Sequence, residues 1–286
     1  MLHKSRVARA VWYSSRQRAR IALGLKPRAR PWPPNGLSAT IAHHTELVQR
    51  FVEAAPPAWN VAGRAVCEAG CSDCLTIASF LVAKGAAKVD LVEPSPPVLD
   101  PQQTEVLRVV QQKGLPLDTT ILRAGNPLSL DSSRVTYHNC FMETLGYEGR
   151  YDYLFSLDVM EHVEDLDGFY AACRKVLKPG GQMFHSIDFS GHSEFEDPMP
   201  PLDFQTYPDW LYALMYPPYS RVTRSLPSDH HAAMRRAGLV LDETRVLRRA
   251  GPDYLTAIWP RLRRRFRSSP PEEVGILQGV LTAHRE

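Results

Sequence analysis

Apolar and polar positions alternate along the chain in a pattern that predicts successive strands and helices beyond the first sixty residues. Short apolar runs are typical of buried strands, whereas apolar residues that recur every three or four positions indicate helices. We expect strands at 65–70, 88–93, 151–157 and 182–187, an extended segment at 119–123, and two closing strands at 239–247 and 274–283.

Helical spacing falls between these strands, and we expect helices at 40–53, 75–82, 101–113, 163–176 and 227–238. Ser72 or Asp73 is the expected N-cap of the second of these helices, and Gly85 its expected end. Strands that alternate with helices predict a mostly parallel sheet covered on both faces. The sequence therefore predicts an α/β fold.

Two regions depart from this alternation. Residues 26–34 are rich in proline, which fixes φ and removes a hydrogen-bond donor, so they are expected to form an extended linker. Residues 188–226 hold eight aromatic residues and six prolines with poor periodicity. An aromatic insertion after a buried strand predicts a wall over a substrate, although a flap that only caps the sheet has the same composition.

Length and composition limit the class of protein. At about 150 residues per domain, a chain of 286 residues holds one large domain or two small ones. No apolar run reaches the ~18 residues of a transmembrane helix, and five cysteines are too few for a disulfide scaffold. We expect a cytoplasmic protein with a helical extension at 1–60 and one domain at 61–286.

Positive charge is concentrated at the N-terminus. Nine of the 34 basic residues and none of the 31 acidic residues precede Glu46, and a second basic run spans 261–267. Such asymmetry is found in proteins that bind nucleic acid, anionic lipid or acidic substrates, and also in solvated basic helices. An acid-free start also has the composition of a mitochondrial transit peptide, or of a helix that covers an active site.

The ends of the first two predicted strands carry candidate ligand-binding residues. Gly70 permits a tight turn after Glu68, and the helix that follows offers free N–H groups to an anionic ligand. Glu93 ends the next strand, where an acid can accept hydrogen bonds from two ribose hydroxyls. In open α/β sheets ligands bind at this edge. The two acids therefore predict a nucleotide-like ligand.

Four motifs resemble those of class I S-adenosylmethionine-dependent methyltransferases. They are Glu68-x-Gly70, Val92-Glu93-Pro94, Tyr151-Asp-Tyr-Leu-Phe-Ser-Leu-Asp-Val-Met-Glu-His-Val163 and Val176-Leu-Lys-Pro-Gly-Gly181. The resemblance covers roughly residues 64–188 and implies a Rossmann-like methyltransferase fold with a seven-stranded, mostly parallel sheet. It also implies that S-adenosylmethionine is the cofactor.

The resemblance also implies the cofactor-binding residues. The turn Glu68, Ala69, Gly70 and Cys71 would hold the methionine part, Glu93 beside Pro94 the ribose, and Leu157 with Asp158 the methyl-donor side. Two departures stand out. Ser72 and Cys74 replace further glycines of the turn, and Asn139-Cys140 stands where the family has an acid for the adenine amine.

Cys67, Cys71 and Cys74 have the spacing of radical S-adenosylmethionine enzymes, which hold an iron–sulfur cluster through three thiolates. Cys67 lies inside a predicted strand, and Asp73 stands where that family has an aromatic residue. We therefore expect three buried, small residues without a metal.

Methyl transfer requires an aligned acceptor and, for a hydroxyl or a protonated amine, a base with a pKa near neutrality. His192 is the expected base and Asp188 its expected partner, while His162 serves as a second base or packs against the cofactor loop. His185 lies inside a strand and is expected to be structural. Paired histidines at helix surfaces are usually solvated, so no role is assigned to the pair His230-His231. A metal site formed by His185, Asp188 and His192 matches no common spacing.

The sequence thus predicts methyl transfer from S-adenosylmethionine to an oxygen or nitrogen atom of a small-molecule acceptor in a biosynthetic pathway. The alternative is a catalytically degenerate binding module whose basic ends contact an anionic partner. A nucleic acid or anionic lipid partner is not supported directly, because the basic segments lack the aromatic-interleaved pattern of an RNA module.

Overall fold

The computed structural model describes residues 4–23, 36–72, 74–97, 99, 101–125, 128–192, 200–216 and 221–286. The linker expected at 26–34 and the N-cap candidate Asp73 lie outside these ranges. Within them, no helix is both long enough and apolar enough to cross a membrane.

One seven-stranded sheet organises the chain, in the order β5-β2-β1-β6-β7-β9-β8. Its strands are β1 (Ala65–Ala69), β2 (Lys88–Val92), β5 (Val135–His138), β6 (Tyr151–Leu157), β7 (Leu177–Asp188), β8 (Leu239–Arg249) and β9 (Ile276–Arg285). The first five pair in parallel, and β9 runs antiparallel between β7 and β8. A short pair, β3 (Leu122–Arg123) and β4 (Ser129–Leu130), stands apart. The predicted seven-stranded, mostly parallel sheet is confirmed.

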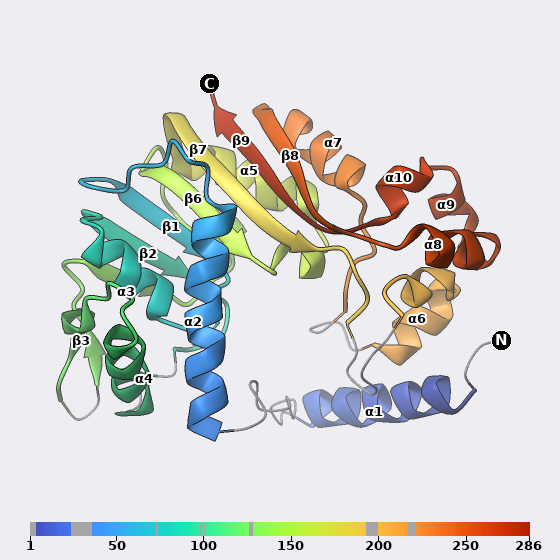
Figure 1. Ribbon diagram of the computed structural model, residues 1–286, viewed down its shortest axis with the longest axis horizontal. Coiled ribbons are helices and arrows are strands. Elements are labelled where there is room, and N and C mark those ends of the chain that lie inside the picture. The colour runs from blue at the N-terminus through green and yellow to red at the C-terminus, as the bar shows by residue number, and fades with distance from the viewer. Residues whose placement is uncertain are drawn as a thin grey trace.

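The helices lie on both faces of the sheet and at one end of the molecule (Figure 1). They are α1 (Lys4–Ala22), α2 (Gly36–Ala54), α3 (Thr76–Ala83), α4 (Pro101–Gln112), α5 (Leu166–Val176), α6 (Asp209–Met215), α7 (Pro227–Arg236), α8 (Pro252–Ile258), α9 (Arg264–Arg267) and α10 (Pro271–Val274).

Two hydrophobic clusters fill the two faces of the sheet. Side chains of α2, α3 and α4 pack against one face, and those of α5 and α7 pack against the other. On the first face, Phe51 of α2 stacks edge-on against Phe155 of β6, with ring centroids 4.8 Å apart, and also contacts Phe184 of β7. This contact holds α2 across the sheet and brings its polar residues close to the strand ends.

A third hydrophobic cluster lies beside the sheet and is formed by α1, α6 and the segments around α8, α9 and α10. It contains Phe204, Tyr207, Tyr212 and Tyr216, four aromatic residues of the insertion expected at 188–226. Arg18 of α1 donates to the carbonyl oxygen of Ala213 at 2.7 Å, and Figure 1 shows α1 beside α6. These rings therefore build a core, and their role as a substrate cover stays a prediction.

Several boundaries differ from those expected. Helix α3 begins at Thr76 after Leu75 and has no side-chain cap, so the expected cap at Ser72 is wrong; Ser72 instead adopts φ +52° in the turn. Residues 119–121 form a 3-10 turn in place of an extended segment, because the Asp118 side chain accepts the N–H of Thr120 and closes the turn. Sequence patterning also missed β5 and the three short helices between β8 and β9.

Candidate active site at the carboxyl ends of β1, β2, β6 and β7

The turn after β1 is built by the backbone. Gly70 has φ +76°, and its N–H donates to the carbonyl oxygen of Val92 at 2.8 Å, which joins the ends of β1 and β2. A Cβ atom at Gly70 would lie 2.4 Å from Cγ2 of Val159, so only glycine fits between the two loops. This close approach brings the end of β1 against the loop that follows β6.

Glu68 points a carboxyl group into the interior. Its side chain is buried, Oε2 has no hydrogen-bond partner among the described residues, and burial raises its pKa to about 8. A buried carboxylate is stabilised by a nearby cation. The orphaned oxygen therefore fits the ammonium group of the methionine part of S-adenosylmethionine, and the role expected for residues 68–71 stays a prediction.

Glu93 is held in place by two backbone donors. Its Oε1 accepts the N–H of Ser95 at 2.9 Å and its Oε2 accepts the N–H of Ser72 at 3.2 Å, so the carboxylate bridges the ends of β1 and β2. Each carboxylate oxygen can accept a further bond. Glu93 therefore has the free acceptor capacity that ribose hydroxyls would need, and its role in binding them stays a prediction.

Asn139 fastens the loop after β5 to the loop after β2. Its Nδ2 donates to the carbonyl oxygens of Glu93 and Pro94, at 3.2 and 2.8 Å. Cys140 is half-buried, and the side chain of Phe141 is 63% exposed. Sequence reasoning missed Phe141, whose exposed ring offers a flat apolar surface beside Asn139.

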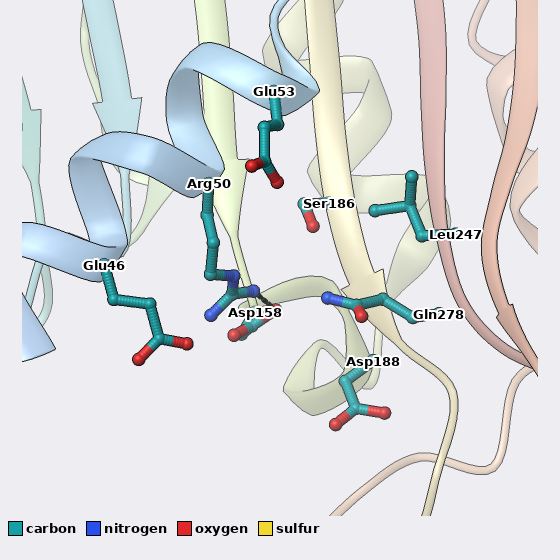
Figure 2. Close-up of a pocket in the computed structure, with 8 residues that line it drawn as sticks. All are labelled: Glu46, Arg50, Glu53, Asp158, Ser186, Asp188, Leu247 and Gln278. Carbon is teal, nitrogen blue, oxygen red and sulfur yellow. Dashed lines mark hydrogen bonds and ion pairs between the residues drawn. The ribbon is translucent and has the colours of Figure 1, made fainter.

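A cavity of about 430 Å³ opens between α2 and the ends of β6, β7 and β9. It is lined by Glu46, Arg50, Glu53, Asp158, Ser186, Asp188, Leu247 and Gln278 (Figure 2). Arg50 reaches from α2 to Asp158, with 2.5 Å between Nη2 and Oδ1. The lining is mostly charged or polar, and its size is that of a small-molecule site. Arg50 was missed because its partner lies more than a hundred residues away.

Four ionisable side chains meet next to this cavity, at the ends of β6 and β7. Nε2 of His192 lies 3.5 Å from Oδ2 of Asp188 and 3.8 Å from Oε1 of Glu161, and the rings of His162 and His192 are 5.1 Å apart. The structure therefore brings together the three residues expected to act on the acceptor. It adds Glu161, which sequence reasoning passed over as part of a family motif.

The environment sets the charge of each member. Burial and the coulombic effect of Asp158 raise the pKa of Glu161 well above its ordinary value, and burial together with His192 lowers the pKa of His162. For Asp188, burial alone would raise the pKa, but hydrogen bonds from His192 and Ser190 outweigh it and lower the pKa. The lowered pKa keeps Asp188 anionic beside His192.

Two other histidines are interior residues. His185 is fully buried, and its Nδ1 lies 2.7 Å from Oγ of Ser156, which agrees with its expected structural role. His230 is also fully buried and bonds to Tyr170 and Ser225, so the solvation that is usual for paired histidines on a helix surface does not apply to it. Its helix packs against α5, which covers that residue. Burial lowers the pKa of both histidines to about 3.

The three cysteines with cluster-like spacing do not converge. Cys67 belongs to the hydrophobic cluster on one face of the sheet and Cys71 to the cluster on the other face. Among the described residues, they form no group with ligand atoms close enough to share an ion. Their surroundings are those of buried small residues, as expected.

Comparison with known proteins agrees with this geometry. A family profile described as "Methyltransferase domain" matches residues 67–183. A ubiquinone biosynthesis O-methyltransferase of Idiomarina loihiensis is 34% identical over 82 residues, which are 28% of this chain and 34% of that protein. The human mitochondrial protein of the same name is 36% identical over 74 residues, 24% of this chain and 20% of that protein. The chain thus spans about a third, or less, of the length of these relatives.

A solved S-adenosylmethionine-dependent methyltransferase from Mesorhizobium loti superimposes with a TM-score of 0.48 at 14% identity, over 86% of this chain and all of that one. The family match and the sheet order β5-β2-β1-β6-β7 fall on the same part of the chain, the part that also holds Gly70 and Glu93. Residues 67–183 therefore match a methyltransferase domain, and the parallel part of the sheet is built from this same stretch of the chain.

Proposed function

We propose that the protein transfers a methyl group from S-adenosylmethionine to an oxygen or nitrogen atom of a small, polar acceptor. The observation that carries this proposal is the position of the charged cavity. It opens at the ends of β6, β7 and β9, next to the turn at Gly70 and Glu93 that fits the cofactor. A donor site and an acceptor site on one edge of the sheet are what group transfer requires.

Residues of the turn supply the cofactor contacts in this proposal. Glu68 binds the ammonium group, Glu93 the ribose hydroxyls, and the loop around Asn139 contacts the adenine. When bound, S-adenosylmethionine supplies a methyl group on a sulfonium sulfur: the bond to the acceptor forms as the carbon–sulfur bond breaks, leaving S-adenosylhomocysteine. The protein aligns the two partners and excludes water from them.

The cluster of Asp188, His162 and His192 lies on the acceptor side. A neutral hydroxyl or a protonated amine must lose a proton for the transfer to be balanced, and this proton leaves through the cluster. Arg50 and Asp158 contact polar groups of the acceptor from the other side of the cavity. Leu247 is the single apolar side chain that the described residues contribute to the cavity lining, so a polar acceptor fits better than an apolar one.

The similarity to ubiquinone biosynthesis O-methyltransferases favours oxygen as the acceptor atom. That similarity covers a limited part of each protein. We therefore propose a hydroxyl-bearing acceptor of a biosynthetic pathway, which the charged lining of the cavity supports.

Calorimetric titration of the full chain with S-adenosylmethionine and with S-adenosylhomocysteine tests the proposal. We expect micromolar binding of both, weakened at least tenfold by Glu93→Ala, because the carboxylate that would hold the ribose is lost. Glu243→Ala removes an exposed carboxylate from β8, away from the site, and serves as the matched control. A folded protein that binds neither ligand would overturn the proposal in favour of the binding module.

A further inference from the structure

Three potential metal ligands lie together next to the charged cavity, beside Asp188: Glu161, His162 and His192. Each offers one ligand atom, and these atoms all lie within 4.8 Å of one another. Among the described residues this is the one group of three or more histidine, cysteine or carboxylate side chains with this property. We propose that these three residues form a binding site for one divalent transition-metal cation of the zinc type, contrary to the expectation from the sequence that no metal binds.

The carboxyl group of Glu161 is the strongest argument for a bound cation. Its side chain is only 1% exposed, and neither Oε1 nor Oε2 has a hydrogen-bond partner among the described residues. Buried polar groups are normally satisfied, and a buried carboxylate needs a cation or several donors. A single proton would satisfy one oxygen at most, whereas a metal ion compensates the charge and engages the carboxylate directly.

His162 is already oriented as a ligand. Its Nδ1 lies 3.3 Å from the carbonyl oxygen of Arg221, which can only accept a hydrogen bond, so Nδ1 carries the proton. The lone pair then lies on Nε2, the other ring nitrogen. Metal-binding histidines commonly donate their second N–H to a backbone carbonyl in this way. The tautomer that the fold selects is therefore the one that metal binding requires.

His192 completes the set from a different part of the chain. Its Nε2 lies between the carboxylates of Asp188 and Glu161, a position in which a positive charge is favoured. Its side chain is 33% exposed, so it can move and also leaves a path by which an ion can enter. Ligands about 2 Å from a zinc ion lie closer together than 4.8 Å, so the partly exposed His192 has to move inward.

The donor set indicates the class of metal. Two imidazoles and one carboxylate suit zinc and its first-row neighbours, whereas Mg²⁺ and Ca²⁺ prefer oxygen ligands alone. Three protein ligands leave a coordination position open, as in catalytic zinc sites. The site therefore has room for a ligand oxygen from outside the protein.

The role of the ion rests on the proposed function. An acceptor hydroxyl in the open position would be oriented toward the methyl donor, and coordination would lower its pKa so that its proton passes to water. His192 would then act as a ligand in place of the base expected from the sequence, and Asp188 would stay beside it as a counter-charge.

Titration of tag-free, chelator-treated full-length protein with Co²⁺ tests the site. We expect visible absorption bands that saturate at one Co²⁺ per chain, and their loss when Zn²⁺ displaces Co²⁺. Glu161→Gln and His192→Asn should each weaken binding at least tenfold. His284→Asn removes a histidine that pairs with Asp242 at the opposite end of β9, so its Co²⁺ affinity should stay unchanged.

Circular dichroism checks that the variants fold. If Glu161→Gln is unstable, His192→Asn tests the site alone, because His192 is partly exposed and its substitution should disturb the fold less. Absence of binding, or equal binding by the parent, Glu161→Gln and His192→Asn, overturns the metal site. Calorimetry with S-adenosylmethionine separates the two proposals: cofactor binding without Co²⁺ binding removes only the metal site, and Co²⁺ binding without cofactor binding removes only the proposed function.

Discussion

The two halves of the candidate site are built in different ways. On the cofactor side, backbone N–H groups of Ser72 and Ser95 hold Glu93, and Gly70 packs directly against Val159. On the acceptor side, charged side chains from α2 and from the ends of β6 and β7 face one another, and both oxygens of Glu161 have no partner among the described residues.

This difference shows which half depends on the shape of the backbone and which on charge. A turn made of backbone contacts suits a cofactor that is the same throughout a family. A cluster of side chains from distant segments can differ from one protein to the next and suits the acceptor. Substitutions on the cofactor side should therefore disturb the site through steric conflict. Substitutions on the acceptor side should disturb it through uncompensated charge.

Gly70→Ala should have the largest effect, because the new Cβ meets Val159 at 2.4 Å in a backbone conformation with φ +76°. We expect S-adenosylmethionine binding to weaken at least 100-fold, as measured by calorimetry. Gly63→Ala is the matched control: Gly63 has φ +72°, but its Cβ would meet nothing within 4 Å, so only the backbone strain of ~1 kcal/mol remains. Equal losses in the two variants would show that strain, and not the close approach, determines the effect.

Much of the cofactor side could be predicted because its residues are close in sequence and follow predicted strands. Glu68, Gly70 and Glu93 each end or follow a strand whose apolar run is visible in the sequence. The sheet was predictable for the same reason. The edge strand β5 was not, because its four residues include Thr136 and His138 and lack a clear apolar pattern.

The acceptor side could be predicted only in part. Asp188 and His192 lie four residues apart, so their proximity follows from the local sequence. The pair of Arg50 with Asp158 and the approach of Glu161 to His192 depend on how α2 and the segment after β7 fold back. No local pattern encodes such contacts. The burial of His230 was missed for the same reason, since it depends on packing against Tyr170 of α5.

The interior histidines differ from the histidines of the acceptor-side cluster because their burial makes the stability of the fold depend on pH. Burial lowers the pKa of His185 to about 3, so the folded state keeps it neutral while the unfolded state binds a proton below its ordinary pKa of 6.5. Stability present above pH 6.5 is therefore lost as the pH falls toward 3. Between pH 7 and pH 5 this loss is about 2 kcal/mol.

Chemical denaturation at pH 7 and pH 5 measures this contribution. His185→Asn cannot be protonated, so its stability should fall by about 2 kcal/mol less than that of the parent over this interval. His284→Asn, which changes a partly exposed histidine, should follow the parent. A His185→Asn variant with the same pH dependence as the parent would show that the His185 imidazole is accessible to protons in the folded state.

Breaking the ion pair between Arg50 and Asp158 from either side should give unequal results. Arg50→Ala removes the cation and leaves Asp158 near Glu161 and Asp188, so we expect a loss of about 1–2 kcal/mol in chemical denaturation. Asp158→Asn breaks the same pair but relieves the crowding of carboxylates, and asparagine tolerates the φ of +52° at this position. Its loss should stay below about 1 kcal/mol. Equal losses would mean that the carboxylates do not repel one another.

The smallest effect concerns Asn139, which by the sequence resemblance is predicted to lie where class I methyltransferases have an adenine-binding acid. Asn139→Asp restores that acid, yet it removes the amide that donates to the carbonyl oxygens of Glu93 and Pro94 and places a negative charge against both. These exposed hydrogen bonds contribute ~1 kcal/mol of free energy, so their loss should lower the affinity for S-adenosylmethionine roughly fivefold. Asn139→Ala loses the same bonds without the repulsion and should bind slightly better than Asn139→Asp. Calorimetry distinguishes the cases: if Asn139→Asp binds more tightly than the parent, contact with the adenine amine outweighs the fastening of the two loops.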